Sequence, residues 1–150
     1  MHKILMTGFA LTIGLAGWAG GAAAGPFSAT RPVIALLGSQ LHVGTAEGHL
    51  DGSGTVVIYS QANPEVKCSG EFTSSAEAGG AGQLRCSDGT TVAFKFQRLS
   101  VFTGHGVGSS SRGAMSFTYG LSADEAERYL KLPPGKTLKR KGDELQLAEL

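Results

Sequence analysis

The sequence has little of several residue types that mark well-known classes of protein. Its 150 residues include only two cysteines and one tryptophan, and charged residues make up 17% of the chain. Thirteen Lys and Arg residues nearly balance twelve Asp and Glu residues, which gives a formal net charge of +1 at pH 7. This balance argues against a nucleic-acid binder and against a strongly basic membrane-surface protein.

Motifs for metal binding and catalysis are also missing. The chain contains no CxxC, HExxH, His-x-His or Gly-x-Ser-x-Gly sequence. Beyond the N-terminal segment its histidines are His42, His49 and His105, and the spacing of the first two suits no zinc site. We therefore expect no metal and no cofactor. The lack of a catalytic constellation favours binding over catalysis, without settling whether the protein is an enzyme.

A long hydrophobic run occurs only at the start of the chain. Lys3 precedes an apolar run from Ile4 to about Ala19, and small residues follow, with Ala22-Ala23-Ala24 fitting the cleavage rule. This pattern predicts a signal peptide over residues 1–24 and a single small β-rich domain over residues 25–150. The alternative is an uncleaved membrane anchor, but the run is rich in glycine and lacks a positive flank. The protein is expected in the periplasm or secreted, with no stable membrane span after cleavage.

The only two cysteines, Cys68 and Cys86, flank a glycine-rich stretch. In an exported chain two cysteines first suggest a disulfide bond, and with only two the pairing is forced. The alternative is a pair of reduced thiols, which an oxidising compartment disfavours. The bridge would close a loop of about 18 residues and stabilise the fold by about 3 kcal/mol in the chain-entropy model.

Apolar and polar residues alternate between residues 55 and 120, which is the period of a β-strand. Val92, Phe94 and Phe96, for example, would share one face of a strand. Turn signals punctuate the pattern at residues 51–54, 79–82, 87–89 and 104–108. The pattern predicts a mainly β protein, an antiparallel meander sheet with one face in solvent.

The alternation also predicts how neighbouring strands pair. If Cys68 faces Cys86 across a hairpin, Gly70 lies opposite Leu84 and the apolar faces match. A three-residue loop over residues 87–89 then pairs Leu84 with Val92, and its last residue, Gly89, should have a positive φ. The alternation slips at Arg98, which predicts a bulge or strand end there.

The C-terminal third predicts one short helix and one hairpin. Ser122 and Glu125 form a capping box, and Pro133-Pro134 would end a helix of about ten residues. Because a helix of this length needs tertiary packing, we expect it on the apolar face of the sheet, against Phe94, Phe96, Phe117 and Tyr119. Residues 136–150 are expected to form a hairpin around Gly142-Asp143.

The spacing of Gly70-Glu71-Phe72, Gly80-x-Gly82 and Asp88-Gly89 resembles the MORN repeat, around residues 52–89. That repeat has a Gly-Glu-aromatic strand, a Gly-x-Gly turn, and an Asp-Gly turn after five intervening residues. The chain departs from the pattern over residues 91–96, which contain no glycine. MORN proteins are sheet-forming scaffolds that bind proteins or membranes, so the resemblance implies an interaction or structural role.

One segment offers a candidate site. Gly104 to Gly113 is expected to be a loop, in which His105, Ser110 and Arg112 could provide a base, a nucleophile and an anion-binding charge. The alternative is a flexible hairpin loop with no activity.

Together these features favour an exported small β-sheet binding or scaffold protein of the bacterial cell envelope. Its expected partners are envelope proteins or a surface ligand, and not nucleic acid. The alternative is a small secreted hydrolase, or an enzyme inhibitor that inserts the Gly104–Gly113 loop. A third possibility is a subunit of an envelope complex.

Overall fold

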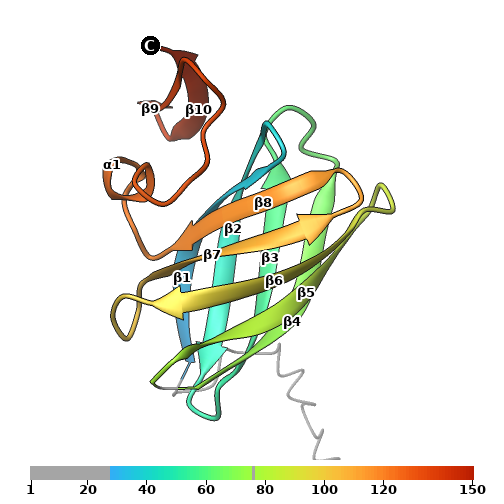
Figure 1. Cartoon of the computed structure of the whole chain (residues 1–150), viewed down its shortest axis with the longest axis vertical. Helices are drawn as coiled ribbons and strands as arrows, with labels where there is room; N and C mark the ends of the chain where they lie inside the picture. The colour runs from blue at the N-terminus through green and yellow to red at the C-terminus, as the bar shows by residue number, and fades with distance from the viewer. Residues whose placement is uncertain (1–27, 76) are drawn as a thin grey trace, which may run out of the picture.

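The computed structural model describes residues 28–75 and 77–150, so the expected signal peptide lies outside the described residues. Eight antiparallel strands follow one another around a closed barrel (Figure 1). They are β1 (Ser28–Leu37), β2 (Gln40–His49), β3 (Ser53–Ser60), β4 (Lys67–Ser75), β5 (Gly79–Cys86), β6 (Thr91–Arg98), β7 (Gly104–Ser110) and β8 (Gly113–Tyr119). The mainly β, antiparallel prediction is confirmed, and the structure adds closure: β1 pairs with β8, with Val33 opposite Tyr119.

Closure of the sheet explains the alternation in the sequence. A barrel has an inner and an outer face, and successive residues of each strand point to opposite faces. Val92, Phe94 and Phe96 of β6 are buried inside, whereas Lys95 is exposed outside. In an open sheet the apolar face would need another element to cover it. In the closed barrel the strands on the opposite side cover it.

The predicted pairing of the central strands is confirmed. Cys68 lies opposite Cys86 and Gly70 opposite Leu84, and the two cysteines form a disulfide bond. Leu84 lies opposite Val92 across the three-residue loop, where Gly89 has a φ of 90°. Strand β6 ends at Arg98, as the slip in the alternation indicates.

The glycines of residues 79–82 do not form the predicted turn. They belong to β5, and Gly80 and Gly82 pair with Phe96 and Phe94 of β6. An added Cβ at Gly82 would lie 2.6 Å from Cζ of Phe94. These glycines therefore make room for aromatic rings inside the barrel. In the sequence alone, a cluster of glycines with this packing role looks the same as a turn.

The prediction for the helix is right about its cap and wrong about its length and position. Ser122 accepts a hydrogen bond from the backbone N–H of Glu125, but α1 covers only Ala123–Ala126. Beyond it, Tyr129 stacks on His105 and the N–H of Lys131 donates to Ser116 Oγ. Such tertiary contacts outweigh the weak helical tendency of a short segment.

Helix α1 lies on the outside of the barrel, together with the hairpin of β9 (Lys136–Lys141) and β10 (Glu144–Glu149) (Figure 1). The hairpin turns at Gly142 and Asp143, as predicted. A second apolar cluster joins these segments to outward side chains of β1 and β2, and it consists of Ile34, Leu36, Leu41, Leu121, Ala126, Leu130, Leu138 and Leu145. The aromatic face expected to hold the helix instead faces the barrel interior.

Within the described ranges, no helix has the length and apolar character needed to cross a membrane.

Candidate ligand-binding cavity

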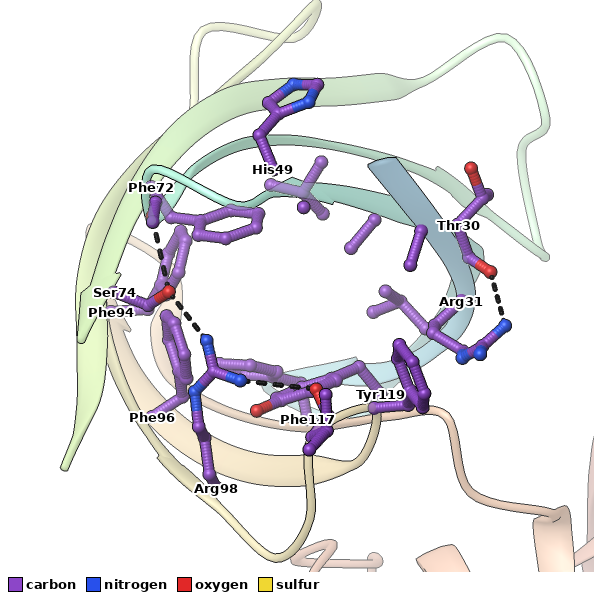
Figure 2. Close-up of a pocket in the computed structure, with 18 of the residues that line it drawn as sticks. Thr30, Arg31, His49, Phe72, Ser74, Phe94, Phe96, Arg98, Phe117 and Tyr119 are labelled. Carbon is purple, nitrogen blue, oxygen red and sulfur yellow. Dashed lines mark hydrogen bonds between the residues drawn. The ribbon is translucent and has the colours of Figure 1, made fainter. Parts of the chain in front are cut away.

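The barrel is hollow toward one end, where a cavity of about 1210 Å³ lies between the strands (Figure 2). The N-terminal end of β1, the β2–β3 turn, the end of β4 and the β6–β7 loop surround this end. We call these four segments the open end of the barrel. Inward side chains of the strands form the walls of the cavity, and the four segments of the open end form its rim.

One side of the cavity wall is aromatic. Strands β4, β6 and β8 contribute rings that meet edge to face: Phe94 and Phe117 have centroids 5.4 Å apart, and Phe96 and Tyr119 have centroids 5.7 Å apart. Phe72 completes this wall, with its ring 5.6 Å from that of Phe96. Edge-to-face packing holds rings in fixed positions, so the aromatic wall is a preformed surface.

The opposite wall is built from smaller side chains. Ala35 of β1, Ala46 of β2, and Val56 and Ile58 of β3 line it. Because these side chains are short, they leave the interior unfilled where the rings of the other wall do not reach. The barrel is hollow because the side chains of one wall are large and those of the opposite wall are small.

The far end of the barrel is largely packed with side chains. Leu37, Val92 and the Cys68–Cys86 disulfide belong to the same buried cluster as the cavity wall, but they do not line the cavity. Cys68 is fully buried. The name "closed end" is used below for this part of the barrel. The disulfide therefore ties β4 to β5 beneath the floor of the cavity.

The rim of the open end is apolar and exposed. In the described part of the chain, seven large apolar side chains are notably exposed, and four of them lie at this rim: Leu50, Leu99, Val101 and Phe102. Scattered exposed apolar residues need no explanation, but a cluster around a cavity mouth is typical of a binding site.

Arg98 extends from the end of β6 into the open end (Figure 2). Its guanidinium donates to the backbone carbonyl of Val101 at 3.2 Å and to Ser74 Oγ at 3.0 Å. Its Nε is buried and has no hydrogen-bond partner among the described residues. The side chain is thus held in place by two neutral acceptors while part of its donor capacity is unused.

Two further polar groups flank the opening. Arg31 lies with its guanidinium carbon 4.3 Å from the ring centroid of Phe102 and donates to the backbone carbonyl of Thr30. Burial raises the pKa of the Tyr119 phenol, an effect that the nearby charge of Arg98 partly opposes. Tyr119 therefore stays a neutral O–H group at physiological pH, and both residues line the cavity.

The structure does not bring the predicted site residues together. Gly104–Ser110 is strand β7 rather than a loop, so that prediction is wrong. His105 and Ser110 are five residues apart on this strand, or about 16 Å. His105 stacks on Tyr129, whereas Ser110 donates to the carbonyl of Gly113 in the β7–β8 turn.

Arg112, the third predicted residue, lies at the closed end. Its guanidinium forms an ion pair with Asp88 at 3.2 Å. Hydrogen bonds from Thr90, followed by the charge of Arg112, lower the pKa of this carboxyl group. The pair joins the β5–β6 and β7–β8 turns. The geometry of Arg112 is that of a structural contact.

A second, smaller cavity of about 280 Å³ lies at the closed end. His42 lines it and is buried inside the barrel, with Nδ1 3.2 Å from the backbone carbonyl of Gln40. Burial lowers the pKa of His42, so the ring is neutral at pH 7 and Nδ1–H is the donor to Gln40. Over the described residues no group of three or more His, Cys, Asp or Glu side chains could hold a metal ion.

The sequence analysis missed the residues of the open end. Arg98 was noted only as the place where the alternation slips, and Arg31 was not singled out. A signal was present: in β6 the inward series Val92, Phe94 and Phe96 continues to Arg98. A cation on the apolar face of a strand marks either a strand end or a binding group, and here it marks both.

Comparison of the chain with family models, with curated proteins and with solved structures gives no match. The function must therefore be argued from the cavity itself.

Proposed function

We propose that the protein is an exported binding protein whose barrel holds one small molecule by its apolar part. The observation that carries this proposal is the cavity of about 1210 Å³, walled by aromatic and aliphatic side chains and entered from one end. Cavities of about 300–1,000 Å³ hold drug-sized ligands in other proteins. Eight-stranded barrels with such interiors are well suited to a single small ligand.

The polarity of the barrel supports the same conclusion. Its inner face is apolar, whereas strands β4 to β6 carry exposed charges on the outer face, such as Glu71, Arg85 and Lys95. A water-facing exterior around an apolar interior is what a carrier of a poorly soluble molecule requires. Burying an apolar chain there would be favourable by about 25 cal/mol per Å² removed from water.

The compartment is part of the proposal. The Cys68–Cys86 disulfide is in keeping with an oxidising compartment such as the periplasm or the exterior of the cell. Together with the predicted signal peptide, it favours a ligand met outside the cytoplasm. We therefore keep the expected location in the cell envelope and the expected binding role. The proposed partner is a small molecule, and a scaffolding role is no longer proposed.

A cavity-filling variant tests the proposal. Titration with N-phenyl-1-naphthylamine, a neutral apolar dye that fluoresces when shielded from water, should show saturable binding at one site per chain. Ala46→Phe places a ring in the space opposite the aromatic wall, and we expect at least tenfold weaker binding of the dye. Ala93→Phe is the matched control, because Ala93 is exposed on the outer face of β6.

Equal dye affinity in both variants and in the unmodified protein would place the dye elsewhere and contradict the proposal. Absence of saturable binding in the unmodified protein, across dyes and alkyl chains of different length, would do the same.

A further inference from the structure

The open end of the cavity carries an excess of positive charge. The charged side chains that line the cavity are Arg31, Arg98 and Asp51, with His49 as a further titratable group. Asp51 is in the exposed β2–β3 turn, and its Oδ1 accepts hydrogen bonds from the N–H and the hydroxyl of Ser53. Those hydrogen bonds lower the pKa of Asp51, so it is an anion. The cavity lining therefore contains two arginines and one carboxylate, and that carboxylate is already hydrogen-bonded to Ser53.

Arg98 has no countercharge in the described parts of the chain. The ion pairs there are Arg112 with Asp88 and Lys136 with Glu149, and neither involves the open end. The partners of Arg98 are a backbone carbonyl and a hydroxyl, which are neutral. A half-buried cation with only neutral acceptors and one unpartnered buried N–H is costly to keep, unless another group completes its environment.

Fixed placement distinguishes Arg98 from an ordinary surface arginine. Ser74 Oγ accepts from Arg98 and itself donates to the backbone carbonyl of Gly52. One hydroxyl thus connects β6, β4 and the β2–β3 turn around the opening. A planar guanidinium held in this way presents its remaining donors in a fixed direction, which suits recognition of an oxyanion.

The neighbourhood of Arg98 suits an amphiphile. The aromatic wall begins directly below it with Phe96, which precedes it by one inward position on β6. The Tyr119 phenol, which stays protonated, lines the same cavity. A molecule with its tail in the cavity would therefore end near a cation and a phenol O–H group.

We propose that the ligand is an amphiphilic anion, whose apolar tail fills the barrel and whose acidic head is bound by Arg98 at the open end. The inference rests on the proposed function, because it requires that the cavity be the binding site. Arg31 adds positive charge at the same opening, and Tyr119 can donate a hydrogen bond to the head. Carboxylate and phosphate heads share this chemistry, and the experiment separates them.

The test compares heads on one tail. Dodecanoate, dodecyl phosphate and dodecan-1-ol, each below its aggregation or solubility limit, displace N-phenyl-1-naphthylamine from the unmodified protein and from Arg98→Gln. We expect the better anion to bind about tenfold to a hundredfold more tightly than the alcohol, because charge-assisted hydrogen bonds are the stronger kind. Arg98→Gln should remove this difference while the affinity for the alcohol changes little.

Two further variants keep the test decisive. Arg98→Lys retains a charge without the planar fork and should keep part of the preference for the anion. Arg112→Gln removes an arginine from the closed end and should keep all of it. Thermal melting checks that each variant is folded.

Each outcome has one meaning. Equal affinity for the alcohol and both anions in the unmodified protein would overturn the inference and leave the cavity proposal standing. Anion preference that survives in Arg98→Gln would overturn the role of Arg98. Failure of all three compounds and of the dye to bind would overturn the proposed function together with this inference.

Discussion

The two ends of the barrel each present an arginine, and the arginines differ in their partners. Arg112 at the closed end pairs with Asp88, and the disulfide lies beneath the same turns. Arg98 at the open end has only neutral acceptors, and the exposed apolar rim surrounds it. Groups at the closed end are satisfied within the chain, whereas those at the open end lack partners that a ligand could supply.

This contrast separates stability from binding along one axis of the fold. The closed end is cross-linked and has only a small cavity of about 280 Å³, so it should carry much of the barrel's stability. The open end is hollow and charged, so it should contribute less to stability and more to recognition. The following predictions break or sharpen this contrast, beginning with the largest effect.

Removal of the disulfide should have the largest effect on stability. The double variant Cys68→Ala/Cys86→Ala releases the constraint between β4 and β5 and removes buried sulfur atoms from the core of the closed end. We expect a loss of about 3 kcal/mol or more in the free energy of unfolding, or about 10–15 °C in Tm, by calorimetry. Ser69→Ala, on the exposed face of β4, is the control. An unchanged Tm would show that the closed end does not carry stability.

A methyl group at Gly82 should strain the aromatic wall. The added Cβ would lie 2.4 Å from the backbone oxygen of Glu71, 2.6 Å from Cζ of Phe94 and 2.8 Å from Cβ of Phe72, so both the rings and the paired strand β4 must shift. We expect Gly82→Ala to cost about 1–3 kcal/mol in urea unfolding and to weaken dye binding. Gly48→Ala is matched to it, because its nearest neighbour, Phe72, would lie 3.9 Å away. Equal losses in the two variants would contradict the packing described for the rings.

Acid should weaken the closed end through His42. Burial lowers its pKa in the folded state, so the unfolded chain takes up the proton first. Stability is then complete above about pH 6.5 and falls as the pH drops from there through the lower folded pKa. The negative charge of Asp88 favours the protonated ring of His42 and partly opposes the effect of burial. Arg112 is the other charged residue that lines the same small cavity. His42→Gln should flatten this pH dependence in urea titrations, whereas Ser69→Ala, on the exposed face of β4, should leave it in place.

Removal of the charge at Arg112 should have the smallest effect. The pair with Asp88 is partly exposed, with Arg112 at 56% and Asp88 at 23% side-chain exposure. Such pairs contribute about 0–1 kcal/mol. Arg112→Ala should therefore change the free energy of unfolding by less than about 1 kcal/mol and leave ligand binding unchanged. A loss of binding in this variant would remove the distinction between the two arginines.

Local pairing could be predicted from the sequence because it depends on a period of two. The register around Leu84 and the positive φ of Gly89 follow from keeping apolar residues on one face, and the disulfide, predicted from the two cysteines of an exported chain, agrees with that register. The capping box at Ser122 is equally local. The likeness to MORN repeats stays a prediction, since nothing in the structure bears on it.

Closure and the cavity could not be predicted in this way. Pairing of β1 with β8 joins residues 78 to 86 positions apart, and no local pattern distinguishes a closed barrel from an open sheet. The glycines of β5 indicated a turn because their packing partners, Phe94 and Phe96, come later in the chain. The helix was assigned to the aromatic face for the same reason: without closure, that face needed a cover.

The most direct test of the account is an NMR titration of the 15N-labelled protein with dodecanoate. Saturation at one equivalent should shift the backbone amides of cavity-lining residues, including Ala46, Phe96 and Arg98, with the largest changes around Arg98. The amides of Cys68 at the closed end and of Leu138 in the second apolar cluster, outside the barrel (the outer cluster), should change little. Saturable shifts centred on the outer cluster or the closed end, or no saturable shifts at all, would contradict the account.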